Sequence, residues 1–287
     1  MEYRRLGRTG LKVSTICMGT MQFGWSTEEA QAHAIMSEAV ASGVNFIDTA
    51  DVYSTWVEGN PGGVSEQIIG SWLKSSAVRR DEVVIATKVR GKMGDGPNDQ
   101  GLSRLHILNS VRDSLHRLGT DYIDLYQVHW PDEETPLDET LGALDDLIRS
   151  GLVRYIGCSN YPAWLLAKSL WVSDVRNLAR FDSVQPHYNL VHRAEFEREL
   201  QPLCLDQEIG VIPYSPLAGG FLTGKYRRDN ALPKSDRAGG IRERYMNERG
   251  YTAVDKLEEI GERQGATIAQ TTIAWTLANP AVTSAII

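Results

Sequence analysis

The chain has 287 residues, of which 42% are hydrophobic and 23% are charged, with 26 glycines and 11 prolines. These fractions are typical of a packed globular protein and exclude a disordered or fibrous one. The formal net charge of -7 leaves no basic surplus for phosphate backbones or anionic lipids, so neither nucleic-acid binding nor membrane binding is expected. One domain over residues 1–287 is expected, because a single α/β barrel of roughly 250 residues is common.

The three cysteines, Cys17, Cys158 and Cys204, are too few and too far apart for a disulfide framework or a zinc site. We expect them to be small buried side chains in a reducing compartment, and we expect no bound metal. No apolar stretch follows the charged N-terminal residues, and no window approaches 18 uninterrupted apolar residues. These features predict a soluble cytoplasmic protein.

The first dozen residues carry turn signals at Gly7 and Gly10, which predict a small β-hairpin beneath the floor of the domain. Downstream, short runs rich in Val, Ile and Tyr alternate with segments whose apolar residues recur every three or four positions. This alternation is typical of βαβ units and a parallel sheet. The eight predicted strands lie within residues 12–19, 44–50, 82–88, 122–129, 153–160, 181–189, 210–217 and 282–287.

Helix signals lie between the predicted strands. Ser26 and Glu29 have the spacing of a capping box, and Ser103 precedes an apolar stripe of helical period. The clearest helix follows the fourth strand, where Thr135 is a candidate N-cap and Gly151 marks the end. Each predicted helix separates two predicted strands.

Two arrangements suit eight parallel strands with interleaved helices. In a closed barrel every strand edge is paired, and right-handed crossovers place all helices outside. A doubly wound open sheet would need a glycine-rich turn after its first strand, and residues 19–24 lack the GxGxxG spacing. The sequence therefore predicts an α/β TIM (β/α)8 barrel with an N-terminal β-hairpin.

Two segments depart from a regular barrel. Residues 226–250 are polar and rich in Arg and Asp, which predicts an irregular loop, either a lid or a disordered connection. The sequence stops at Ile287, where a barrel needs one more helix to cover its last strand. We therefore expect the last helix to belong to a C-terminal segment that is absent from this sequence.

Polar residues lie at or just after the ends of successive predicted strands, where a barrel has its active site. Asp48 is near the end of the second strand with Tyr53 five residues on, Lys88 ends the third and His129 ends the fourth. Taken singly, each has a structural explanation as a turn cap, a solvated lysine or a hydrogen-bonded core histidine. Together at one barrel mouth, these four residues predict a catalytic cluster, because ionisable groups perturb one another's pKa at short range.

These residues resemble the catalytic tetrad of the aldo-keto reductase superfamily: Asp48 and Tyr53 in VNFIDTADVY, Lys88 in VVIATK, and His129 in YIDLYQVHWPD. The similarity runs from LGRTGLKVS through VRYIGCSNY and VIPYSPLAGGFLTGK to VTSAII. It implies a TIM barrel that binds a nicotinamide cofactor without a Rossmann fold and reduces aldehydes and ketones to alcohols. NADPH is the expected cofactor and NADH the alternative, since the family segment that grips the 2′-phosphate would follow the eighth strand.

The resemblance also implies a role for each member of the tetrad. Tyr53 is the proton donor, and the ammonium of Lys88 stabilises its phenolate. Asp48 holds Lys88 charged and in place as a partly buried ion pair. His129 orients the substrate carbonyl.

Cofactor contacts follow from the same resemblance. Ser159, Asn160 and Gln185 correspond to residues that hydrogen-bond the nicotinamide carboxamide, with strand-end turn chemistry as the alternative. Tyr214 corresponds to the aromatic side chain on which the nicotinamide stacks, and Arg237 to an arginine on the adenosine side. The full expected set is Thr20, Met21, Asp48, Ser159, Asn160, Gln185, Tyr214, Ser215, Pro216, Leu217, Ala218, Gly219, Leu222, Gly224, Lys225 and Arg237.

Three tryptophans, Trp25, Trp56 and Trp130, follow the first, second and fourth predicted strands. They are expected to be apolar walls for a small carbonyl substrate, and the alternative is that they pack loops onto the barrel. A different class of function is a cofactor-binding regulatory subunit, similar to potassium-channel β subunits. Such a subunit is expected to carry a helical N-terminal extension, whereas this sequence starts at its hairpin, which favours the enzyme.

Overall fold

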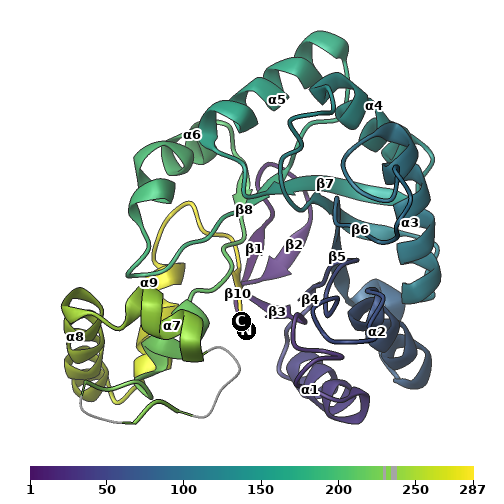
Figure 1. Cartoon of the computed structure of the whole chain (residues 1–287). Helices are drawn as coiled ribbons and strands as arrows, with labels where there is room; N and C mark the ends of the chain where they lie inside the picture. Colours follow the sequence, from purple (N-terminus) through teal and green to yellow (C-terminus); the bar gives the residue numbers. More distant parts are fainter. Residues whose placement is uncertain (229–230, 234–237) are drawn as a thin grey trace.

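The computed structural model describes residues 1–228, 231–233 and 238–287. Eight parallel strands form one curled sheet that is surrounded by helices (Figure 1), which is the predicted TIM-barrel architecture. Their order around the sheet is β10 (Ala285–Ile286), β3 (Ile16–Gly19), β4 (Phe46–Asp48), β5 (Val84–Val89), β6 (Ile123–Val128), β7 (Val153–Ser159), β8 (Ser183–Gln185) and β9 (Gly210–Val211).

Backbone hydrogen bonds join the two ends of this strand order. The amide of Thr283 donates to the carbonyl of Val211 over 2.8 Å, and the amide of Ile286 donates to the carbonyl of Pro213 over 3.0 Å. Val211 and Val282 also form an isolated parallel bridge. The end strands β9 and β10 therefore lie side by side, and the sheet closes on itself.

The first predicted strand, residues 12–19, divides into two elements, so its extent was wrong. Its first half is β2 (Lys12–Ser14), which pairs antiparallel with β1 (Tyr3–Arg5) in the predicted hairpin. Its second half is the barrel strand β3. The chain changes sheets at Ser14, whose amide donates to Asn45 Oδ1 and whose hydroxyl donates to the carbonyl of Ile16.

The hairpin fills the floor of the barrel, as predicted. Leu6 and Val13 have no exposed surface, and they belong to an apolar cluster inside the barrel with Phe46, Leu125 and Ile212. Figure 1 shows β1 and β2 framed by the ring of barrel strands. The interior below the active-site end is thus closed by packed side chains.

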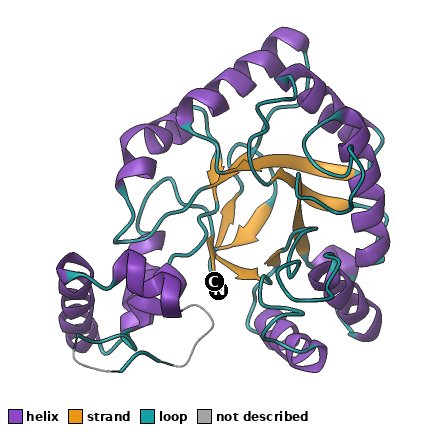
Figure 2. Cartoon of the chain, viewed as in Figure 1, coloured by secondary structure: helices purple, strands orange, loops and turns teal. Residues whose placement is uncertain are grey.

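Helices surround the sheet (Figure 2), and a continuous apolar core lies between them and the outer faces of the strands. The helices are α1 (Glu29–Ala41), α2 (Val64–Ser75), α3 (Arg104–Leu118), α4 (Leu137–Arg149), α5 (Ala163–Arg176), α6 (Gln201–Asp206), α7 (Ala238–Tyr245), α8 (Glu248–Gln264) and α9 (Ile268–Leu277). Shorter helical segments are η1 (Arg80–Glu82), η2 (Phe196–Leu200) and η3 (Ala218–Thr223). In the part of the chain that the structure describes, no helix is long and apolar enough to cross a membrane.

One of the three predicted helix caps is present. The hydroxyl of Ser103 accepts a hydrogen bond from the amide of His106 at the start of α3, as expected. Thr135 instead donates to Asp132, and α4 begins after Pro136 without a side-chain cap. Ser26 does not cap α1, because the N-cap position is Glu28, two residues later, and no side chain caps this helix.

The predicted irregular loop over residues 226–250 is partly helical, so that prediction was wrong for its second half. It contains α7 and the first turn of α8. Ile241 and Tyr245 of α7 are buried against Phe221, Val254 and Leu257, in an apolar cluster separate from the main core. This helix was hard to predict, because few of its residues are large and apolar.

Candidate active site

Lys88 lies at the centre of a buried hydrogen-bonded cluster at the carboxyl ends of β4 and β5. Its Nζ donates to Asp48 Oδ2 over 2.6 Å, to Tyr53 OH over 2.9 Å and to the carbonyl of Thr49 over 2.8 Å. Lys88 has no exposed surface and Asp48 has 1%. Asp48 and Lys88 are brought together because β4 and β5 are adjacent parallel strands whose side chains at these positions point into the barrel.

The charges in this cluster shift the pKa of two groups. Burial alone would lower the pKa of Lys88, but the charge of Asp48 and the contact with Tyr53 outweigh it and hold the pKa above its ordinary value. Burial raises the pKa of Tyr53, while the Lys88 ammonium acts in the opposite direction. Lys88 is therefore a permanent cation beside the Tyr53 hydroxyl.

His129 follows β6, and its ring centroid lies 5.9 Å from that of Tyr53. Burial lowers the pKa of His129 to about 3, with further lowering by the charges of Lys88 and Arg90. The imidazole is therefore neutral at physiological pH. A neutral imidazole donates from one ring nitrogen and accepts at the other.

Two glutamines hold the second oxygen of Asp48. Gln127 Nε2 donates to Asp48 Oδ1 over 3.0 Å, and Gln185 Nε2 donates to the same oxygen over 2.9 Å. Gln185 was predicted as a cofactor contact, and its amide nitrogen here contacts Asp48. Gln127 was not singled out in the sequence, although a buried amide within an apolar run was a signal for it.

A cavity of about 440 Å³, called here the central cavity, opens above this cluster and is lined by Asp48, Tyr53, His129 and Trp130. It also brings together most of the residues predicted to contact the cofactor. Those that line it are Thr20, Met21, Asp48, Ser159, Asn160, Gln185, Tyr214, Ser215, Pro216, Leu217 and Gly219.

The wall of the central cavity next to β7 and β9 is a hydrogen-bonded pair. Tyr214 OH donates to Asn160 Oδ1 over 2.9 Å, and Asn160 Nδ2 donates to the carbonyl of His129 over 3.0 Å. Behind it, the ring of His187 stacks on Tyr214 with centroids 5.1 Å apart and an angle of 8° between the planes. The Tyr214 ring is thus held at its hydroxyl and on one face.

The predicted pyrophosphate segment after β9 has an unusual backbone. Ser215 and Gly219 line the central cavity, and both have positive φ, at 55° and 67°. Gly220 has φ 105°, and a Cβ on it would lie 3.3 Å from the ammonium nitrogen of Lys225. The amides of Ala218 and Gly220 are bonded to carbonyls within the turn, so the positive charge of Lys225 is the feature of this segment that suits an anion.

Other predicted residues of this segment lie elsewhere. Ala218 and Leu222 are fully buried in the apolar cluster that includes α7 and α8, and they do not line the central cavity. Gly224 caps η3 with φ 83°. Arg237 lies outside the described residues.

Of the three predicted tryptophans, Trp25 and Trp56 are not among the residues that line the central cavity. Trp25 and Trp56 form an edge-to-face pair with centroids 5.6 Å apart, and Trp56 lies 6.4 Å from the Tyr53 ring. Trp130, next to His129, lines the central cavity itself. Gln22, which the sequence analysis missed, also lines it, and its buried Oε1 has no partner among the described residues.

The described residues contain neither a metal-binding cluster nor a disulfide. Within the described ranges, no group of three or more His, Cys, Asp or Glu side chains is arranged to hold a metal ion. Cys17, Cys158 and Cys204 are free and buried.

Comparison with known proteins agrees with this geometry. The family model described as "Aldo/keto reductase family" matches residues 15–287. The chain belongs to the aldo/keto reductase family. It is an oxidoreductase.

Relatives of this aldo/keto reductase differ in their named functions. "Uncharacterized oxidoreductase YrpG" of Bacillus subtilis is 42% identical over 291 residues, covering 100% of this chain and 86% of that protein. "Versiconal hemiacetal acetate reductase" of Aspergillus parasiticus is 37% identical, covering 98% and 86%. "Probable voltage-gated potassium channel subunit beta" of Arabidopsis thaliana is also 37% identical, covering 100% and 86%.

Proposed function

We propose that this aldo/keto reductase reduces aldehydes and ketones to alcohols with NADPH, and that Tyr53 is the proton donor. The observation that carries the proposal is the position of Lys88 Nζ, within hydrogen-bond distance of both Asp48 and Tyr53 at the floor of the central cavity. This arrangement supports proton donation to an oxygen that gains negative charge.

Lys88 makes proton release by Tyr53 easier. A phenol with an ordinary pKa near ~10 is a weak acid at neutral pH, and burial weakens it further. When the proton leaves, the ammonium 2.9 Å away stabilises the phenolate. Asp48, held by Gln127 and Gln185, keeps that ammonium in place.

His129 supplies a second polar group on the same cavity. Its neutral imidazole can donate a hydrogen bond from a ring N–H to the carbonyl oxygen of the substrate, and it adds no second positive charge beside Lys88. Together Tyr53 and His129 would orient the carbonyl over the floor of the cavity. Tyr53 and His129 would thus contact the substrate, whereas Lys88 and Asp48 would act on Tyr53.

The residues around the cavity fit a nicotinamide cofactor. The flat, fixed ring of Tyr214 offers a stacking surface, and the unpartnered Gln22 Oε1 offers a hydrogen-bond acceptor. Lys225, beside the turn at Ser215, Gly219 and Gly220, supplies a positive charge that suits a pyrophosphate. When bound, a reduced nicotinamide would supply the hydride that the carbonyl carbon accepts.

The decisive experiment follows the absorbance of NADPH and NADH at ~340 nm with a panel of aldehydes. The parent protein is expected to oxidise NADPH, and Tyr53→Phe is expected to lose turnover by at least about 100-fold, because it lacks the proton. Its affinity for NADPH, measured by fluorescence, should change little. Tyr3→Phe, at an exposed tyrosine of the hairpin, is the matched control.

The outcomes separate the enzyme from the regulatory subunit. Full turnover in Tyr53→Phe would contradict the proposed mechanism. Tight binding of NADPH without turnover of any aldehyde would favour the second candidate, which the similarity to a plant protein named as a potassium channel subunit supports. A cytoplasmic location stays a prediction.

A further inference from the structure

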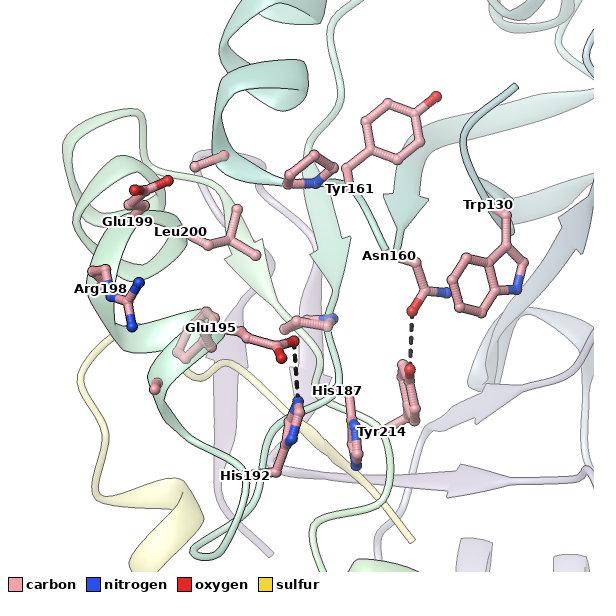
Figure 3. Close-up of a pocket in the computed structure, with 15 residues that line it drawn as sticks. Trp130, Asn160, Tyr161, His187, His192, Glu195, Arg198, Glu199, Leu200 and Tyr214 are labelled. Carbon is pink, nitrogen blue, oxygen red and sulfur yellow. Dashed lines mark hydrogen bonds and ion pairs between the residues drawn. The ribbon is translucent and has the colours of Figure 1, made fainter. Parts of the chain in front are cut away.

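An exposed, largely apolar stripe runs along α5. Trp164, Lys168, Trp171 and Val175 are spaced four, three and four residues apart, so their side chains lie in one line on the helix surface. Trp164 is 63% exposed, Trp171 61% and Val175 62%. We call these four residues the α5 stripe. None of them lines the central cavity or the cavity beside it that Figure 3 shows, so the α5 stripe is separate from the candidate active site.

The α5 stripe is not what holds this helix on the barrel. The helix buries Leu166, Ser169, Leu170 and Ser173 on its other side, and Figure 1 shows α5 at the outer edge of the ring. Single exposed apolar side chains are normal on a protein surface, whereas several in one continuous patch mark a contact with another molecule. The α5 stripe is therefore a candidate interaction surface.

A groove of about 360 Å³ lies beside the C-terminal part of the α5 stripe. Its walls include the last three residues of the stripe together with Leu137 and Val172. Trp164, the first residue of the stripe, does not line it. The same surface thus carries an exposed indole at one end and a partly apolar groove at the other.

We propose that the α5 stripe is the contact surface of a symmetric homodimer. In a dimer with a twofold axis one surface meets a second copy of itself, and residues equally far from the axis exchange places. With the axis midway between Lys168 and Trp171, Trp164 faces the partner subunit's Val175, and Lys168 faces the partner subunit's Trp171. The order of the four residues therefore makes the stripe complementary to itself.

Each of these contacts has a favourable chemistry. The Trp164 indole enters the groove beside the partner subunit's Val175, where its apolar surface leaves water. The ammonium of Lys168 lies over an indole, which attracts a cation. At the edge of the groove Arg176 is paired with Asp138 over 3.5 Å, so its charge is compensated within one copy.

The stripe is large enough to anchor a dimer. Its two indoles offer roughly 300 Å² of exposed surface per copy, more than a third of the ~800 Å² per partner in a standard interface. Val175, the methylene groups of Lys168 and the walls of the groove add to this area. Two antiparallel copies of α5 that cross at about 20° stay in contact along the whole stripe.

Sedimentation velocity of the full chain tests the dimer directly. The parent is expected to sediment at twice the 31.9 kDa of one chain at micromolar concentration. Trp164→Glu should raise the dissociation constant by about 100-fold or more, because it removes an anchor from both halves of the interface. Ile35→Glu is the matched control, since Ile35 is an exposed apolar residue on α1, across the ring from α5 (Figure 1).

A charge pair tests the twofold arrangement. Val175→Lys alone should also weaken the dimer, whereas Trp164→Glu and Val175→Lys combined in one chain should recover at least about tenfold of the affinity lost by Trp164→Glu. The introduced carboxylate then faces the introduced ammonium of the partner subunit. Within one chain the two positions are about 16 Å apart along the helix, too far to form an ion pair.

Circular dichroism establishes folding of each variant, and if Trp164→Glu does not fold, Trp171→Glu removes the second indole instead. A parent that sediments as a single chain at about 50 µM would overturn the homodimer and leave the stripe to a different protein. A dimer that Trp164→Glu does not weaken would place the interface elsewhere. Failure of the charge pair to recover affinity would overturn the twofold contact. None of these measurements uses turnover, so they test this inference independently of the proposed function.

Discussion

At the scale of single residues, the site depends on one buried cation and the groups that compensate its charge. Lys88 has three hydrogen-bond acceptors around Nζ, and one of them is the carboxylate of Asp48. An ammonium that loses its carboxylate in a buried site keeps its desolvation penalty without the compensating attraction. The stability of the barrel and the chemistry of Tyr53 are therefore linked through Asp48.

Asp48→Asn should reduce the free energy of unfolding by about 3 kcal/mol, because it leaves the Lys88 charge without its carboxylate. Urea denaturation of parent and variant measures this loss. Asp81→Asn is the control, since the ion pair of Asp81 with Arg79 is exposed and contributes little. If the parent and Asp48→Asn were equally stable, the Asp48 carboxylate would not be needed to compensate the buried charge of Lys88.

The neutral state of His129 predicts how stability depends on pH. Its pKa in the folded protein is about 3, below the ordinary value near ~6.5, so the unfolded chain binds the extra proton between these values. Stability from this group is complete above pH ~6.5 and is lost as the pH falls toward 3. When the pH falls from 7 to 5, the free energy of unfolding of His129→Gln should therefore decrease by about 2 kcal/mol less than that of the parent.

Urea denaturation at the two pH values checks the prediction for His129. His116→Gln, at an exposed position on α3, should retain the parent's pH dependence. An identical pH dependence in His129→Gln and the parent would show that His129 is not buried in its neutral form.

At the scale of elements, the hairpin turn is held by a close backbone approach. Gly7 has φ 55°, and a Cβ on it would lie 2.6 Å from the carbonyl oxygen of Glu208 and from the amide of Gly210. The turn therefore rests directly against the start of β9. A side chain at this position would need both a left-handed backbone and a displaced strand.

Gly7→Ala should destabilise the protein by more than about 1 kcal/mol, since the left-handed conformation alone costs that much and the contact with β9 adds to it. Thermal unfolding measures the effect. Gly10→Ala, in the same hairpin, is the matched control, because a Cβ on Gly10 meets no atom within 4 Å. Equal melting temperatures for the two variants would contradict the close approach.

At the scale of the whole molecule, the central cavity draws its walls from many strands. Its lining residues lie on or just after β3, β4, β6, β7, β8, β9 and β10. A ligand there contacts opposite sides of the closed sheet at once. Ligand binding and barrel stability should therefore be coupled.

NADPH at a concentration about 100-fold above its Kd should stabilise the folded protein by about 2.7 kcal/mol. A thermal-shift titration measures this stabilisation, and a parallel titration with NADH compares the two cofactors. Tyr214→Ala should reduce the shift, because it removes the flat ring and its bond to Asn160. An unchanged melting temperature at saturating NADPH would argue against the proposed cofactor site.

Much of the fold and site was predictable because local signals were strong. Each of the eight apolar runs overlaps a barrel strand, since hydrophobic periodicity reflects which residues must be buried. The proximity of Asp48, Tyr53, Lys88 and His129 was predictable because they lie at or shortly after strand ends, and parallel strands bring their carboxyl ends to one edge. Helix caps were less predictable: the hydroxyl of Thr135 has a competing partner in Asp132.

The sequence by itself determined the barrel, the hairpin and the polar residues that meet at the barrel mouth. Only the tertiary structure decided the hydrogen bonds of Gln127 and Gln185 to Asp48, the neutral state of His129 and the shape of the central cavity. The physical reason is distance along the chain. Periodicity acts within a few residues, whereas burial, charge compensation and cavity shape arise from groups that meet only when the barrel closes.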